Sequence, residues 1–140
     1  METVEEYLKL AEIDYAAAEV LLDSSLIVSC TQHCVQATEK SLKAFVVKYS
    51  TISDRHIMHS HDCYEIYSHC LGLGLTAFDD DIVNNIAEFD GYYKTRYPSG
   101  SNIIITEEIA VKSFNTAEIV IDEIKRILLV NKNEEEFNKI

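Results

Sequence analysis

The chain has 140 residues, enough for one domain with a substantial core, and its 47% hydrophobic content is that of an ordinary globular protein. Its 24 acidic and 12 basic residues give a formal net charge of −12, which argues against general affinity for nucleic acid or anionic membranes, because both attract Lys and Arg. A small basic pocket or a basic partner protein is still compatible with this charge.

The chain carries no signal for a membrane or for secretion. Its apolar runs are all shorter than the roughly 20 residues that a membrane span needs. The first residues, METVEEYLKL, are acidic and amphipathic, unlike a secretory signal. We therefore expect a cytoplasmic protein.

Two long helices are expected at the start of the chain. Thr3 is followed three residues later by Glu6, which is the pattern of a helix capping box. One face of the helix that follows is apolar or aromatic, with Val4, Tyr7, Leu8, Ala11, Tyr15, Ala18 and Leu22. Residues 23–25, DSS, interrupt it, and a second helix is expected over residues 26–49. The short link predicts that the two helices pack antiparallel as a hairpin.

The stretch over residues 31–48 organises the rest of the chain. It has no Gly or Pro, and one stripe of it, at steps of three and four, consists mainly of small residues: Cys30, Cys34, Ala37, Ser41, Ala44, Phe45 and Lys48. Because small side chains allow another backbone to come close, we expect this helix at the centre of the fold, packed on more than one side. Glu39 and Lys43, off the stripe, form a favourable i,i+4 pair.

Three shorter apolar patterns predict the remaining helices. Ser60 is a plausible N-cap for a third helix, with Asp62 near its positive end. That helix presents Cys63, Ile66, Tyr67 and Cys70, and the sequence LGLGL at 71–75 ends it. Asp79 or Asp80 can cap a fourth helix, whose expected inward residues are Ile82, Val83, Ile86, Phe89 and Tyr93. Thr106 can cap the last helix, with a stripe of Ala110, Phe114, Ala117, Ile121, Ile124 and Leu128.

The sequence therefore predicts an all-α protein, an antiparallel up-and-down bundle of four or five helices. Residues 97–100 read as a turn, and the apolar run at 103–105 is too short to require a strand. Residues 1–130 form the single expected domain, and residues 131–140 are a polar C-terminal tail.

The cysteines and histidines do not predict a metal site. In a cytosolic helical protein, four cysteines are by default buried, reduced thiols. Two groupings could suggest zinc: His56, His59 and His61 with Cys63, and His33 with Cys30 or Cys34. Neither has the spacing of a known zinc motif. We therefore expect no metal and no cofactor.

Three motifs resemble the HEPN family (higher eukaryote and prokaryote nucleotide-binding domain). The sequence QHCVQATEKSLKAF at 32–45 resembles the family's second-helix signature. The pair His61-Asp62 resembles the His-Asp that opens its third helix, and YKTRYP at 93–98 resembles its R-Y-P element. Order and spacing agree, and the resemblance covers about residues 4–130. Cys63 departs from the family pattern, which usually has Leu there.

The resemblance implies a helical bundle that often dimerises and that binds nucleotides or RNA. Many family members are encoded beside a minimal nucleotidyltransferase, as toxin–antitoxin pairs. The active ribonucleases of the family carry R-x4-6-H, in which Arg and His converge across the dimer on an RNA phosphodiester. We therefore expect a homodimer, through a face of the second and fourth helices or their neighbours, with a nucleotidyltransferase as a possible partner.

This sequence departs from the ribonuclease pattern. Arg96 occupies the place of the motif's Arg, but residues 101–103 are Ser, Asn and Ile, without a His. A literal R-x5-H does exist, from Arg55 to His61, in the connection before the third helix. So loose a pattern needs structural context before it indicates catalysis. A ribonuclease using Arg55 and His61 is therefore the alternative, and no catalytic residue is the expectation.

Two interpretations of Arg96 are open. In the first, its guanidinium forms a structural salt bridge with one of the many carboxylates of the chain, such as Glu88 or Asp90 on the preceding turns. In the second, it binds an anion, because Arg suits planar, bidentate recognition of phosphate. The expected ligand-binding residues are then Lys40, His61, Tyr93, Arg96 and Tyr97, in a non-catalytic protein that binds a nucleotide or a protein partner. A structural interaction module without any ligand is a further alternative.

Overall fold

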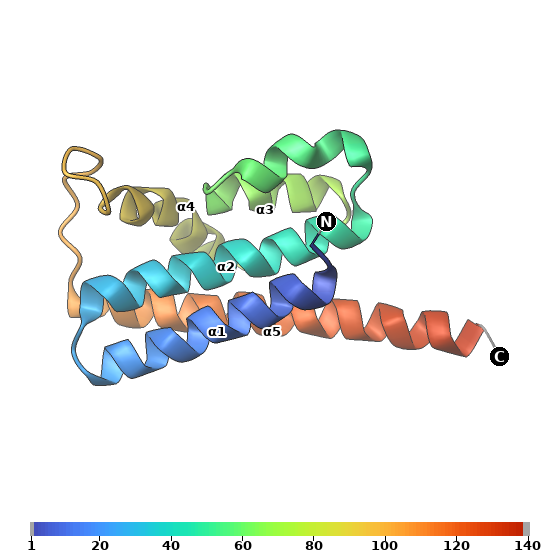
Figure 1. Ribbon diagram of the computed structural model, residues 1–140, viewed down its shortest axis with the longest axis horizontal. Coiled ribbons are helices and arrows are strands. Elements are labelled where there is room, and N and C mark those ends of the chain that lie inside the picture. The colour runs from blue at the N-terminus through green and yellow to red at the C-terminus, as the bar shows by residue number, and fades with distance from the viewer. Residues whose placement is uncertain (1, 139–140) are drawn as a thin grey trace.

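The computed structural model describes the backbone of residues 2–138 and the side chains of residues 2–51 and 56–129. All regular structure in this part is helical, without a strand. The α-helices are α1 (Val4–Asp23), α2 (Ile27–Tyr49), α3 (Cys63–Gly72), α4 (Asp80–Lys94) and α5 (Glu107–Asn138), and a 3-10 helix, η1 (Ile52–His59), follows α2. The helices pack as a bundle, which confirms the predicted fold class (Figure 1).

Helix α2 is the centre of this bundle, as its small-residue stripe predicts. It contacts α1, α3, α4 and α5 and lies between the α1–α5 side and the α3–α4 side (Figure 1). Thirteen of its 23 residues are buried, whereas α1 buries only Ala11, Asp14 and Ala18. A helix enclosed this way has to bury polar residues as well as apolar ones, and α2 buries both Glu39 and Lys43.

The α1–α5 side of α2 is packed with small residues. The fully buried members of this cluster are Ala11 and Ala18 of α1, Cys30, Cys34 and Ala37 of α2, and Ala110 and Ala117 of α5. Side chains this small let the three helix backbones approach closely, and this is the packing that the sequence predicts. The α3–α4 side has a core of larger side chains, among them Leu42, Phe45, Tyr67, Ile86 and Phe89.

All four cysteines are buried as free thiols, as predicted. The Sγ of Cys63 lies 3.6 Å from the carbonyl oxygen of Val35, and the Sγ of Cys70 lies 3.4 Å from that of Leu42. Burial raises the pKa of the Cys63 thiol well above its usual range and raises the pKa of Cys70 to about 12. These thiols therefore stay protonated and act as small core side chains.

The caps of α1, α3 and α4 can be compared with those predicted, and Asp79 precedes α4 as expected but makes no capping hydrogen bond with its side chain. Thr3 caps α1 by accepting a hydrogen bond from the Glu6 amide, as predicted. The N-cap of α3 is Asp62, not Ser60, because the Asp62 carboxylate accepts from the amides of Tyr64 and Glu65. A carboxylate beside the positive end of the helix makes Asp62 the better cap.

Two further details differ from the sequence predictions. On α4 the buried aromatic residue next to Phe89 is Tyr92, whereas Tyr93 is only half-buried. Helix α5 continues through residues 131–138, which the sequence analysis assigned to a polar tail, and residues 139–140 of that tail lie outside the described part. No helix of the described residues is long and apolar enough to cross a membrane.

Candidate functional site

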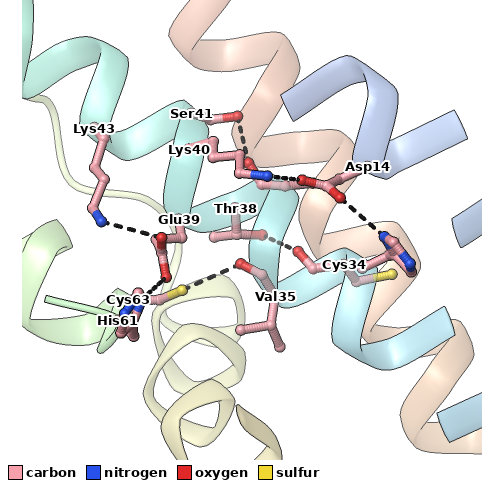
Figure 2. A network of polar contacts seen from close by, with 12 residues as sticks. Asp14, Cys34, Val35, Thr38, Glu39, Lys40, Ser41, Lys43, His61 and Cys63 are labelled. Carbon is pink, nitrogen blue, oxygen red and sulfur yellow. Dashed lines mark hydrogen bonds and ion pairs between the residues drawn. The ribbon is translucent and has the colours of Figure 1, made fainter. Parts of the chain in front are cut away.

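Two clusters of charged side chains lie on different sides of α2, and they begin at consecutive residues, Glu39 and Lys40 (Figure 2). Successive residues of an α-helix point about 100° apart, since 3.6 residues make one turn. Lys40 therefore reaches α1, while Glu39 reaches the segment that precedes α3. Each cluster joins one carboxylate to one lysine and one histidine.

The first cluster, called here the Asp14 cluster, joins α1 to α2. Asp14 is only 8% exposed. Its Oδ1 lies 2.9 Å from the Nδ1 of His33, and its Oδ2 accepts a hydrogen bond from the ammonium of Lys40. These contacts tie two residues of α2 to one of α1, so the cluster serves to hold the two helices in register.

The second cluster, called here the Glu39 cluster, is more deeply buried. Glu39 and Lys43 are 4% and 5% exposed, and the Nζ of Lys43 lies 3.1 Å from the Oε2 of Glu39. The Nδ1 of His61 lies 3.1 Å from the other carboxylate oxygen. Because an ionised carboxylate only accepts hydrogen bonds, the Nδ1 of His61 must donate here, and its Nε2 points away from Glu39.

His61 continues into a row of aromatic and cationic side chains. Its ring stacks on Tyr93 with ring centres 5.1 Å apart and an angle of 15° between the planes. The guanidinium carbon of Arg96 lies 5.2 Å from the centre of the same Tyr93 ring, which is cation–π geometry. Tyr97 meets Tyr93 edge-on, with centres 6.2 Å apart. These four residues are called here the Arg96 cluster.

The Arg96 cluster contains four of the five ligand-binding residues that the sequence predicts. The fifth, Lys40, belongs to the Asp14 cluster. Its neighbour Glu39 is the residue that reaches the Arg96 cluster, through His61. The predicted pair of Glu39 and Lys43 is present, but its burial was not predicted.

Arg96 makes no ion pair with any described residue. The two carboxylates suggested as its partners pair with lysines instead: Asp90 Oδ2 lies 2.9 Å from the Nζ of Lys94, and Glu88 Oε2 lies 2.9 Å from the Nζ of Lys112. The interpretation of Arg96 as a structural salt bridge is therefore wrong for these two partners. The side chain is exposed, so its donors face solvent and are available to an anion.

Gln32 of α2 fixes the end of α4, from which this cluster projects. Its Nε2 donates to the carbonyl oxygen of Tyr92 at 2.7 Å and to the Oγ1 of Thr95 at 2.8 Å. Gln32 is the first residue of the second-helix motif, and Tyr92 and Thr95 flank the Tyr93 that begins the R-Y-P element. The two motifs thus meet in space. Both motifs are evident in the sequence, but their contact is not.

The candidate catalytic and metal-binding residues that remain are only partly placed by the structure. The side chain of Arg55 lies outside the described part of the chain, so the predicted Arg55–His61 pair is not placed. His56 is exposed, and its ring lies edge-on to His69. Within the described residues, no group of three or more His, Cys, Asp or Glu side chains could hold a metal ion.

Comparison with known proteins gives a family and two similar folds. The family model for the HEPN domain matches residues 4–127. The crystal structure of ST0689, an archaeal HEPN homologue, covers 89% of this chain and 97% of its own, with a TM-score of 0.64 and 20% identity. TT1696 from Thermus thermophilus covers 90% and 98%, with a TM-score of 0.70 and 18% identity. At such identities the two structures establish the fold alone. No curated protein matches the chain.

Proposed function

This chain belongs to the HEPN domain family, and we propose that it binds a nucleotide through the Arg96 cluster without cleaving RNA. The observation that carries the proposal is Arg96 itself, an exposed guanidinium that makes no ion pair with the described residues of a chain with twice as many acidic as basic residues. A cation kept apart from so many carboxylates is suited to an external anion.

The geometry around Arg96 suits a phosphate. Its planar guanidinium can donate two parallel hydrogen bonds to phosphate oxygens, and packing against Tyr93 restricts its orientation. Tyr93 is in turn held by His61 and by the α4 end that Gln32 fixes. The donors of Arg96 are thus partly pre-organised, which lowers the entropic cost of binding.

Tyr97 is the ring best placed to take a nucleobase. It is 55% exposed, whereas the ring of Tyr93 is already in contact with His61 and Arg96. Stacking on an aromatic ring contributes about 1–3 kcal/mol per base. The surface position of the cluster and the net charge of −12 oppose binding of a polyphosphate, so the proposed affinity is weak.

The proposal of a partner protein rests on the family resemblance. We propose that this protein acts beside a minimal nucleotidyltransferase, in a toxin–antitoxin-like pair. The ribonuclease motif lacks its His at residues 101–103, which favours a non-catalytic role. An adjacent gene for a nucleotidyltransferase would support this pairing.

A second candidate, an endoribonuclease, is favoured by the contact between His61 and Glu39. A carboxylate on Nδ1 orients the imidazole and leaves Nε2 outward, which is the arrangement of a general base. Arg96 packs on the same Tyr93 ring as His61, and in this candidate function its guanidinium would stabilise a phosphorane-like transition state.

Titration with ATP and with a short RNA separates the two candidates. Weak nucleotide binding that Arg96→Ala abolishes, without RNA cleavage, would support the proposal. Lys94→Ala is the matched control, since Lys94 is a neighbouring exposed cation that is already paired with Asp90. Cleavage of RNA that His61→Ala abolishes would replace the proposal with the ribonuclease. Absence of both activities would contradict both candidates and leave an interaction module.

A further inference from the structure

Helices α4 and α5 are joined by polar contacts along only part of their length. The Nδ2 of Asn85, near the middle of α4, donates to the Oγ1 of Thr116 at 3.0 Å. One turn further along α4, Glu88 pairs with Lys112 of α5. In the other direction, from Asn85 to the start of α4, no hydrogen bond or ion pair between described residues joins the two helices. Their contact is therefore open at the end where α4 begins.

A groove of about 470 Å³ lies at this open end, which is a size typical of binding sites. Its apolar lining comes from the segment before α4, from α4 and from α5, and consists of Ala77, Phe78, Ile82 and Ile119. Ile119 is 45% exposed, so the groove leaves apolar surface in contact with water. The wall formed by Phe78 is fixed to α3, because its amide donates to the hydroxyl of Tyr67 at 3.0 Å and the two rings stack.

The charges around the groove are mainly negative. The charged side chains of its lining and of the adjoining first turn of α4 are Asp79, Asp80, Asp81, Asp122, Glu123 and Arg126. Arg126 donates to both carboxylate oxygens of Glu123, at 3.1 and 2.5 Å, so these two charges offset each other. Asp79 and Asp122 make no ion pair with any described residue, and the side chain of Asp79 does not cap α4. The positive end of α4 carries only about half an elementary charge, less than the aspartates beside it.

From these features we infer that the groove binds a basic amphipathic segment of a partner protein, with apolar side chains on its floor and Lys or Arg side chains against Asp79 and Asp122. Amphipathic helices bind other proteins by laying their apolar face into such grooves. The charge of the rim selects a basic segment over an acidic one. A larger groove between α1 and α5, of about 720 Å³, is lined by both basic and acidic side chains, so its charge selects no occupant.

This inference names the surface and the chemistry of a partner, whichever protein that partner is. It does not depend on nucleotide binding, because the groove lies at the start of α4 and the Arg96 cluster lies at its end. The ATP titration and the peptide titration described next therefore succeed or fail separately.

Fluorescence anisotropy of a labelled peptide, about four turns of helix with Leu on one face and Lys on the other, tests the groove in the full chain. The wild type should bind the peptide, and Ile119→Asn should raise the dissociation constant about tenfold, because it removes apolar surface from the groove. Val111→Asn is the matched control: Val111 is an apolar residue of α5 that is 41% exposed and lies outside the groove lining. This control should bind like the wild type.

Charge reversal separates the groove from the general acidity of the chain. Asp122→Lys should raise the dissociation constant about fivefold or more, and added salt should weaken binding to the wild type. Asp23→Lys, at the exposed end of α1, changes the net charge by the same amount and should have a much smaller effect. Three results would overturn the inference: no binding of the peptide, an equal loss in Asp23→Lys and Asp122→Lys, or equal binding of the same peptide with Glu in place of Lys.

Discussion

The Asp14 cluster and the Glu39 cluster have the same composition and different environments. Each joins one carboxylate to a lysine and a histidine, and each involves α2. In the Asp14 cluster the carboxylate comes from α1 and both bases come from α2. In the Glu39 cluster the carboxylate and the lysine come from α2, and the histidine comes from the segment before α3.

The two clusters differ in the contacts that each histidine makes beyond its carboxylate. Among the described residues, His33 has no aromatic or cationic neighbour that would extend the Asp14 cluster. His61 instead stacks on Tyr93 and so connects a buried carboxylate to an exposed arginine. Two clusters of the same composition therefore have different roles. One connects two helices on one side of α2, and the other forms part of a candidate binding surface on the other side. Burial and connection to the surface decide the role, not the residue types.

The largest expected loss of folding stability follows from the replacement of Glu39. Glu39→Ala leaves the ammonium of Lys43, a residue only 5% exposed, without its carboxylate. Removing one member of a buried pair costs about 3–5 kcal/mol, so the urea midpoint should fall sharply with little change in slope. The double variant Glu39→Met with Lys43→Met should be more stable than the single one, because no buried charge is left unpaired. A single variant as stable as the wild type would mean that Lys43 reaches water.

The next effect is at Ala37, on the side of α2 that faces α1 and α5. Its side chain is fully buried among other small residues. Ala37→Leu should cost about 1–3 kcal/mol, because close helix packing leaves no room for a larger side chain. Thermal unfolding measures this, and Ala87→Leu on the exposed face of α4 is the control. No loss of stability at Ala37 would contradict the close packing of α1, α2 and α5.

A smaller effect is expected at Asp14. Asp14→Ala leaves Lys40 and His33, whose side chains are 24% and 40% exposed and can therefore be solvated. The expected cost is about 1–2 kcal/mol, below that of Glu39→Ala. Urea unfolding of the two variants side by side checks the order. A larger loss at Asp14 than at Glu39 would reverse the comparison between the clusters.

The fold was largely predictable because it depends on local patterns. The apolar spacing located the five α-helices, and the small residues of α2, such as Cys34 and Ala37, predicted its central position. The candidate site was predictable in its residue types but not in its connections. Lys40 and Glu39 are neighbours in sequence, and only the placement of α1 and of the segment before α3 determines which of them contacts the Arg96 cluster.

Other features depend on contacts that sequence patterns do not encode. In the sequence, Gln32 is recognisable only as a polar residue of the second helix. Its hydrogen bonds to Tyr92 and Thr95 form because α4 ends beside it. The burial of Tyr92 in place of Tyr93 has the same origin, since a rotation of one helix position changes which ring faces inward. Neither contact has a signal in a single sequence.

The smallest effect concerns Glu88, an exposed carboxylate that joins α4 to α5. Hydrogen bonds from Tyr92 and Lys112 lower the pKa of Glu88 below its usual value. A lowered pKa in the folded state adds stability above the unfolded pKa, and that stability is lost as the pH falls through the folded pKa. Tyr92→Phe should therefore cost about 0.5–1 kcal/mol at pH 7 and less in acid. A cost that does not change with pH would contradict this linkage.

The most direct test compares Arg96→Ala with Lys40→Ala in a calorimetric titration with ATP. Both residues were predicted to bind the ligand, but Lys40 belongs to the Asp14 cluster and Arg96 is exposed without an ion pair among the described residues. If the Arg96 cluster holds the phosphate, Arg96→Ala weakens binding about tenfold or more, and Lys40→Ala changes it less than about twofold. Loss of binding in Lys40→Ala with wild-type affinity in Arg96→Ala would contradict the assignment of the phosphate to the Arg96 cluster.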